Sequence, residues 1–168
     1  MTAFAVRLAT VADASIIARH RAEMFSDMGQ LSKELYQPLV EHAAAYLQTA
    51  IPAGEYLGWL ATPAEQPASV VAGAGVQLRR VLPHPDHHSR DRLATGRQAI
   101  VLNVYTEQAW RKRGLARLLM EQVLRWARDS GLETLVLHAS DEGRHLYQVL
   151  GFLPTNELRY SGDLRKIP

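Results

Sequence analysis

The sequence predicts one α/β (α+β) domain in which helices cover both faces of a mixed sheet. Strand-like and helix-like segments alternate along the chain, and no repeat or low-complexity tract interrupts them. The 168 residues, 47% of them hydrophobic, suffice for one packed core, whereas two ordinary domains would need a longer chain. We therefore expect residues 1–168 to form a single domain without an internal linker.

The chain opens with one predicted strand and two predicted helices. Residues 4–9 are apolar and β-branched, as in a short strand. Residues 11–28 carry apolar side chains at helical spacing and end before a glycine. A second helical series covers residues 32–47, and Pro38 is expected to kink or divide it.

Two strand candidates and an irregular segment follow. The strands are expected at 56–61 and 69–78, and the polar segment 83–96 is expected to be an exposed loop. Glycines inside the strands indicate bulges or close backbone approaches at Gly58, Gly73 and Gly75.

The second half of the chain has the clearer periodicity. A strong strand at 98–105 leads to an amphipathic helix at 114–130, then to a strand at 134–139 and a helix at 142–150. One or two terminal strands are expected within 152–165. The resulting order, β-α-α-β-β-β-α-β-α-β, is the basis of the predicted fold class.

The composition excludes several kinds of protein. The sequence has no cysteine, which excludes disulfides, thiolate metal sites and a cysteine nucleophile and favours a reducing, cytoplasmic setting. Its first residues lack the features of a secretion signal, and no apolar run approaches the roughly 20 residues that span a bilayer, so no membrane association is expected. A net charge of +2 does not favour nucleic-acid binding.

The turn between the strand at 98–105 and the helix at 114–130 carries the clearest functional signal. A turn that enters a helix leaves backbone N–H groups unpaired, and the helix dipole adds partial positive charge there. Such a turn suits a phosphate or pyrophosphate, and the small Gly114 and Ala116 would let the anion approach the backbone. Basic side chains surround the turn: Arg111, Lys112, Arg113 and Arg117.

Two interpretations of this basic turn compete, a solvated surface and an anion site. Cations at a helix N-terminus oppose the dipole, and a bound anion would relieve that conflict. The turn also follows a buried strand, where α/β proteins usually bind ligands. Neither Gly-x-x-x-x-Gly-Lys-Ser/Thr nor Gly-x-Gly-x-x-Gly after a strand is present, so nucleotide hydrolysis and dinucleotide binding are not indicated.

Two motifs resemble the GNAT superfamily of N-acetyltransferases. The segment NVYTEQAWRKRGLARLLMEQVLRWA is similar to the family's cofactor-binding motif, Arg/Gln-x-x-Gly-x-Gly/Ala, with Arg111, Gly114 and Ala116 at its defined positions. Further along, Leu146–Phe152 matches the family's Leu-Tyr-x-x-Leu-Gly-Phe. The resemblance covers roughly residues 98–160. It implies a mostly antiparallel central sheet and a splayed strand pair that binds the cofactor.

The resemblance also implies an acyl-CoA-dependent N-acyltransferase, which moves an acetyl group from acetyl-CoA directly to a primary amine of a small molecule or peptide. The strand that ends at Tyr105 should bulge and splay, and the backbone of Val104 and Tyr105 would pair with the pantetheine arm as an added strand does. The backbone N–H groups that would hold the pyrophosphate belong to Lys112, Arg113, Gly114, Leu115, Ala116 and Arg117. No metal is expected.

Tyr147 stands where the family places a general acid that protonates the departing thiolate. A phenol and a thiol have reference pKa values of roughly 10 and 8.5, so the proton transfer is chemically reasonable. The alternative is a tyrosine at the edge of the core. Ser140 stands where many relatives carry an asparagine that contacts the cofactor arm, and a serine would make only part of that contact. Arg144 would either reach a phosphate or be exposed.

The group that accepts the amine proton is left open. His138 is one candidate, although a buried, hydrogen-bonded histidine is the commoner explanation. Asn103 could orient the acceptor instead. Carboxylates in the first helices either face the acceptor site or are solvated surface: Glu23, Glu34 and Glu41. The sequence does not identify the acceptor.

Three histidines and an aspartate at 84–88 raise a metal hypothesis, but so short a run spreads its ligands too little for a closed site. A mobile loop near the acceptor pocket is favoured. Two other functions remain as alternatives: a non-catalytic CoA-binding regulatory module and a nucleic-acid binder built on the basic cluster. The family often forms homodimers through its terminal strands, which would place Tyr160 near an interface.

Overall fold

The central sheet has the strand order β1-β2-β3-β6-β7. The computed structural model describes residues 3–86, 89–155, 157–159 and 161–162. The strands of this sheet are β1 (Phe4–Leu8), β2 (Tyr56–Pro63), β3 (Ala72–Arg80), β6 (Arg97–Thr106) and β7 (Thr134–Leu137). Neighbouring strands are antiparallel except β6 and β7, which are parallel. The predicted mixed, mostly antiparallel sheet is confirmed.

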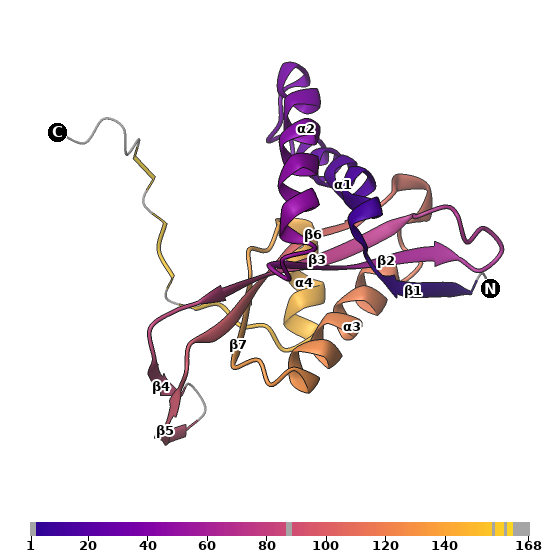
Figure 1. Ribbon diagram of the computed structural model, residues 1–168. Coiled ribbons are helices and arrows are strands. Elements are labelled where there is room, and N and C mark those ends of the chain that lie inside the picture. Colours follow the sequence, from indigo (N-terminus) through magenta and orange to yellow (C-terminus); the bar gives the residue numbers. More distant parts are fainter. Residues whose placement is uncertain (1–2, 87–88, 156, 160, 163–168) are drawn as a thin grey trace.

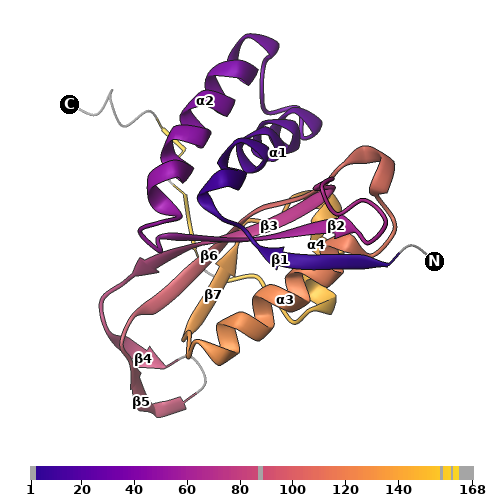
Figure 2. The same cartoon turned by 45° about the vertical axis from the view of Figure 1, so that its right-hand side comes forward.

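Helices cover both faces of this sheet, as predicted. The helices α1 (Ala14–Asp27) and α2 (Lys33–Ala50) lie on one face, and α3 (Leu115–Asp129) and α4 (Asp141–Val149) lie on the other (Figure 1 and Figure 2). Short 3-10 turns stand before α1 and α3, namely η1 (Val11–Asp13) and η2 (Gln108–Trp110). Within the described ranges, no helix combines the length and the apolar character needed to cross a membrane.

Side chains of β2 contribute to the core on both faces of the sheet. Trp59 and Ala61 pack into the layer under α3, whereas Tyr56 and Leu60 pack with α1 and α2. The helix α3 buries one stripe of side chains: Leu115, Leu119, Met120, Val123 and Ala127. Because a fully buried leucine contributes about 1.5–3 kcal/mol, this stripe fixes α3 against the sheet and its first turn at the end of β6.

Pro38 lies inside α2 without dividing it. A proline removes one backbone N–H and crowds the carbonyl group four residues earlier. The helix nevertheless continues to Ala50, where Leu47 and Ala50 are buried in the core. Of the two predicted effects of Pro38, a kink or a division of the helix, the division is wrong, because burial further along the helix outweighs one lost hydrogen bond.

The segment 83–96 is not a loop, which corrects the prediction. The strand β4 (His84–Asp86) pairs antiparallel with β5 (Ser89–Ala94), and this hairpin projects from the main sheet as an arm (Figure 1). Because no helix covers the arm, its two strands have no face to bury there. Their sequence therefore lacks the apolar alternation that marks a half-buried strand, and it resembles a loop. Gly96 returns the chain to β6 with φ of 85°, and a Cβ atom there would lie 1.9 Å from the carbonyl oxygen of Val81.

The terminal strands expected within 152–165 are also absent from the described part of that segment. The strand β7 is therefore the edge of the described sheet. Phe152 packs against the core, but Leu153 and Leu158 are 78% and 94% exposed. The described residues thus bury too little apolar surface to hold this segment against β7. Tyr160, expected near an interface, lies outside the described residues.

Candidate active site

The strand β6 bulges where the resemblance to the family predicts it. Gly75 pairs with Leu102 and Gly73 pairs with Tyr105, so two residues of β6 stand opposite one residue of β3. One of the two, Asn103, has φ of 55°, in the left-handed region where asparagine is enriched among non-glycine residues. The bulge makes β6 twist locally and redirects its side chains.

The strands β6 and β7 splay beyond this point, as predicted. Their parallel ladder runs from the pair Gln98 and Thr134 to the pair Val101 and Leu137. The strand β6 continues to Thr106, and no described residue of β7 pairs with that last part. This open edge offers main-chain groups to an extended ligand in the way an added strand would bind.

The turn after β6 presents a row of unused donors. Among the described residues, no acceptor bonds the N–H groups of residues 112–117, and the first N–H satisfied inside α3 is that of Leu118, 3.0 Å from the carbonyl oxygen of Gly114. Lys112 and Gly114 have φ of 60° and 80°. A Cβ atom on Gly114 would meet nothing within 4 Å, so the space above it is open. Such a helix start suits an anion.

The basic side chains of the turn are mostly held by the protein. Arg111 forms an ion pair with Asp27, donates to the carbonyl oxygen of Thr106 over 3.0 Å, and lies over the Tyr105 ring at 5.6 Å. The Asp27 carboxylate raises the pKa of Arg111. Arg111 therefore ties the turn to α1 and β6.

The other basic side chains lie at the outside of the turn. Arg113 covers the Trp110 ring at 4.7 Å, and Arg117 pairs with Glu121 over 2.8 Å. Lys112 has no hydrogen bond or ion pair within the described ranges. Among the described side chains of the turn, Lys112 and Arg113 are therefore the cations without a carboxylate partner, and the backbone dipoles add to their charge.

Tyr147 lies on α4 with its ring half-buried against the core. It meets Phe152 edge to face at 6.1 Å and lines a groove of about 400 Å³ between β7, α4 and the segment after α4. Burial raises the pKa of Tyr147, so the phenol stays protonated at neutral pH. Its hydroxyl has no hydrogen-bond partner among the described residues, and it is thus available to donate a proton.

The remaining predicted residues of this side flank the start of α4. Ser140 is the N-cap of α4 and accepts a hydrogen bond of 3.2 Å from the N–H of Gly143. Arg144 is exposed and lies 3.5 Å from Asp141. His138 is exposed as well, 3.3 Å from Glu157, so the interpretation as a buried histidine is wrong. The strand β7 ends at Leu137, and the alternation of faces ends with it.

The predicted residues thus form two groups that the splay separates. The bulge lies in β6 and the turn follows that strand, while Ser140 and Tyr147 follow β7. Arg111 over the Tyr105 ring joins the turn to the bulge. Within the described ranges, no cluster of His, Asp or Glu side chains could hold a metal ion. His87 and His88, part of the metal hypothesis, lie outside the described residues.

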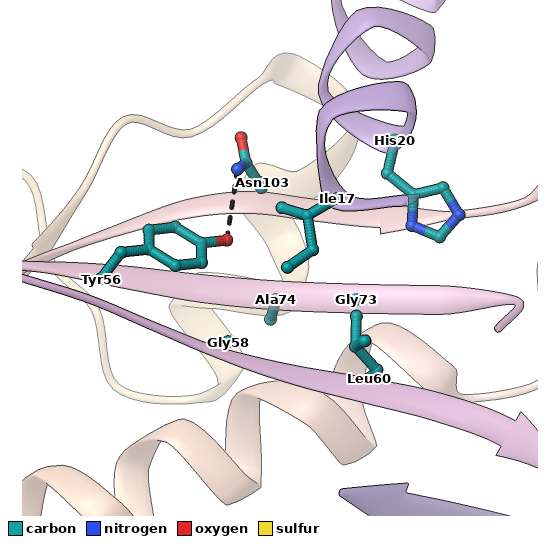
Figure 3. A pocket seen from close by; sticks show the side chains of 8 residues that line it. All are labelled: Ile17, His20, Tyr56, Gly58, Leu60, Gly73, Ala74 and Asn103. Atoms are coloured by element: carbon teal, nitrogen blue, oxygen red, sulfur yellow. Dashed lines mark hydrogen bonds between the residues drawn. The ribbon is translucent and has the colours of Figure 1, made fainter. Parts of the chain in front are cut away.

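A chain of hydrogen bonds on the α1 side of the bulge was not predicted. Asn103 is 7% exposed, and its Nδ2 donates to the Tyr56 hydroxyl over 3.3 Å (Figure 3). The Nη1 of Arg21 donates to Asn103 Oδ1 over 2.6 Å. Burial raises the pKa of Tyr56 to about 12. The bulge residue is thus fixed from β2 and from α1 at once.

A histidine and a carboxylate lie beside this chain. His20 is 2% exposed, and its Nε2 is 3.3 Å from Oε1 of Glu107, which also pairs with Arg19. Burial lowers the pKa of His20 despite the carboxylate. His20, Tyr56 and Asn103 line a cavity of about 10 Å³, close to the volume that one water molecule needs (Figure 3).

The first helices supply fewer free carboxylates than their sequence allows. Glu23 accepts a hydrogen bond of 2.6 Å from Tyr36, and Glu41 accepts one of 3.0 Å from Gln37. Glu34 lies in the first turn of α2, where its own backbone N–H and the Ser32 hydroxyl lower its pKa. His20 had one usable signal, because it follows Ile17 by three positions on the apolar stripe of α1. Polar groups on such a stripe need a buried partner.

Comparison with known proteins identifies the family. The model of the acetyltransferase (GNAT) family matches residues 25–152. A GCN5-related N-acetyltransferase from Ralstonia eutropha is 25% identical with a TM-score of 0.81, over 94% of this chain and 97% of that one. A comparison with curated proteins finds no match.

Two further solved structures share the fold. A predicted acetyltransferase with acetyl-CoA from Clostridium acetobutylicum is 22% identical with a TM-score of 0.77, over 95% of this chain and 96% of that one. An aminoglycoside N-acetyltransferase in complex with CoA is 14% identical with a TM-score of 0.68, over 98% and 97% of the two chains. With the bulged, splayed strand and the turn that opens α3, these matches lead to one conclusion: the chain belongs to the acetyltransferase (GNAT) family.

Proposed function

We propose that this protein transfers the acetyl group of acetyl-CoA to a primary amine. The observation that carries the proposal is the row of unused N–H groups at residues 112–117, which stands directly beyond the open edge of β6. A pyrophosphate with an extended arm is a ligand that needs both features.

Different elements of the site bind different parts of acetyl-CoA. The N–H groups of residues 112–117 bind the pyrophosphate, and Lys112 adds positive charge. The main chain of Val104 and Tyr105 binds the pantetheine arm along the edge that β7 leaves open. The Ser140 oxygen accepts a hydrogen bond from Gly143, but its O–H donates to no described residue. That O–H can therefore donate to the pantetheine arm.

The transfer needs one proton donor and one proton acceptor. The neutral amine attacks the thioester carbonyl carbon, so a C–N bond forms as the C–S bond breaks. Tyr147 gives its phenolic proton to the departing thiolate, and the raised pKa of Tyr147 keeps that proton in place until the thiolate forms. The amine loses its own proton to solvent or to a base of the site.

Thermal unfolding with and without acetyl-CoA tests the binding half of the proposal. Ligand at about 100 times its dissociation constant should stabilise the native protein by roughly 2.7 kcal/mol. In Gly114→Glu, a carboxylate replaces open space beside the donors, and the stabilisation should vanish. Gly131→Glu is the matched control, because Gly131 also has a positive φ, 64°, but ends α3.

Release of the CoA thiol over a panel of amines tests the catalytic half. Turnover that requires both acetyl-CoA and an amine supports the transferase. Binding without turnover on any amine would favour the alternative, a non-catalytic CoA-binding regulatory module. No stabilisation of the wild type at millimolar acetyl-CoA would contradict both the transferase and the CoA-binding module.

A further inference from the structure

Arg21 is a half-buried cation that points at the bulge of β6. It lies on the face of α1 that packs on the sheet, one helical turn from Ile17. Its Nη1 donates to Asn103 Oδ1 over 2.6 Å, and its guanidinium covers the Phe25 ring with Cζ 4.9 Å from the ring centroid. The side chain is therefore held in place by packing and by one neutral acceptor.

Arg21 differs from nearby arginines in lacking a carboxylate. Arg19 pairs with Glu107 and Arg111 pairs with Asp27, but no ion pair joins Arg21 to an acid within the described ranges. Burial lowers the pKa of Arg21, as expected for a cation that has lost water without gaining an anion. Such a charge costs free energy unless an anion completes the site.

The geometry of Arg21 indicates which anion. A guanidinium has five N–H donors, and only one of those on Arg21 is bonded to a described residue. The remaining donors match the two oxygens of a carboxylate. A phosphate dianion would call for a second cation, and the neighbouring Arg19 and Arg111 are already paired with carboxylates.

We propose that Arg21 binds a carboxylate of the acceptor, so that the amine substrate is an amino acid or a similar amine with a free carboxylate nearby. The inference rests on the proposed acetyl transfer, which places the thioester along the main chain of Val104 and Tyr105. Asn103, which Arg21 contacts, is the residue before Val104. A carboxylate on Arg21 therefore positions an amine of the same small molecule next to the thioester.

The test compares free L-amino acids with their C-terminal carboxamides as acetyl acceptors. The α-amine of a carboxamide has the lower pKa, so a larger share of it is neutral and its chemistry alone favours the amide. The wild type should nonetheless have the higher kcat/KM for the free acids, chiefly through KM. Arg21→Gln should reduce that preference by about 10- to 100-fold. Arg21→Lys should restore part of it.

Three outcomes separate the explanations. Arg125→Gln is the control, because it removes the same charge from an exposed site on α3, and it should leave the preference unchanged. Equal turnover of acids and amides by the wild type would overturn the inference while leaving acetyl transfer intact. So would an equal fall of kcat for both in Arg21→Gln, which would place Arg21 at the thioester oxygen. Turnover on no amine would end the proposed function itself.

Discussion

Two regions at the end of β6 are built in opposite ways. The turn at 112–117 offers backbone N–H groups from one short stretch of chain. The network on the α1 side joins Arg21, Asn103 and Tyr56, side chains from three separate elements. A backbone site tolerates most changes of side chain, whereas a side-chain network changes its chemistry with a single substitution. The first region therefore suits a cofactor that is the same in every family member. The second suits the acceptor, which differs from one family member to another.

Tyr147→Phe should have the largest effect on the chemical step. Without the phenolic proton donor, kcat should fall by roughly 10²- to 10⁴-fold, while binding of acetyl-CoA stays unchanged. Steady-state kinetics and a binding titration measure the two quantities separately. Tyr46→Phe, at an exposed tyrosine of α2 that bonds Gln77, is the matched control. An unchanged kcat in Tyr147→Phe would show that Tyr147 is not the general acid and only packs at the edge of the core.

Asn103→Asp should weaken binding of the acceptor while leaving the acetyl-CoA site intact. The substitution gives Arg21 a carboxylate from within the protein, at the position where Asn103 Oδ1 now accepts. The KM for a carboxylate-bearing amine should rise about tenfold or more, with the thermal midpoint kept or raised. The affinity for acetyl-CoA should not change. An unaltered KM would show that Arg21 does not meet the acceptor.

Asn103→Ala separates the charge effect from loss of the network. Alanine leaves the donors of Arg21 without their acceptor and must adopt φ near 55°. The free energy of unfolding should fall by roughly 2–4 kcal/mol, the sum of a lost buried hydrogen bond and left-handed strain. Chemical denaturation measures this loss.

His20 should produce the smallest effect, on stability at acid pH. Burial lowers the pKa of His20 below its ordinary 6.5. Just below that pH, the imidazole is protonated in the unfolded chain and neutral in the folded protein. Stability is therefore complete above pH 6.5 and falls as the pH falls below that value. Urea denaturation at pH 7.5 and pH 5.5 measures the slope, and His20→Gln should flatten it. A wild type that gains stability on acidification would contradict this assignment.

Sequence periodicity predicted the elements that pack a face against another layer and failed for the β4–β5 arm, which no helix covers. The stripe that begins at Leu115 and the apolar strand at 98–105 have strong periodic signals, and both elements are confirmed. The polar sequence of the arm predicts a loop, whereas its two strands pair as a hairpin. Pro38 does not divide α2, because local propensity yields to the burial of Leu47 and Ala50.

The same distinction holds in the site. The turn at Gly114 was predicted from its basic, glycine-containing sequence between a strand and a helix, and the bulge at Asn103 through the resemblance to the family. His20 and Glu107 are 87 residues apart, and Arg21 and Asn103 are 82 apart. Such pairs depend on how α1 packs against the sheet at the end of β6. Neither periodicity nor motif spacing indicates which residues meet across that contact. The splay of β6 and β7 was expected only through the resemblance to the family.

Calorimetric titration with acetyl-CoA and with S-acetylpantetheine would show whether residues 112–117 bind the pyrophosphate. The second ligand keeps the arm and the thioester but lacks the pyrophosphate, so it should bind β6 and miss the turn. The wild type should bind acetyl-CoA at least about 100-fold more tightly, and Gly114→Glu should remove most of that difference without weakening S-acetylpantetheine. Equal affinities in the wild type, or a difference that persists in Gly114→Glu, would contradict a pyrophosphate site at residues 112–117.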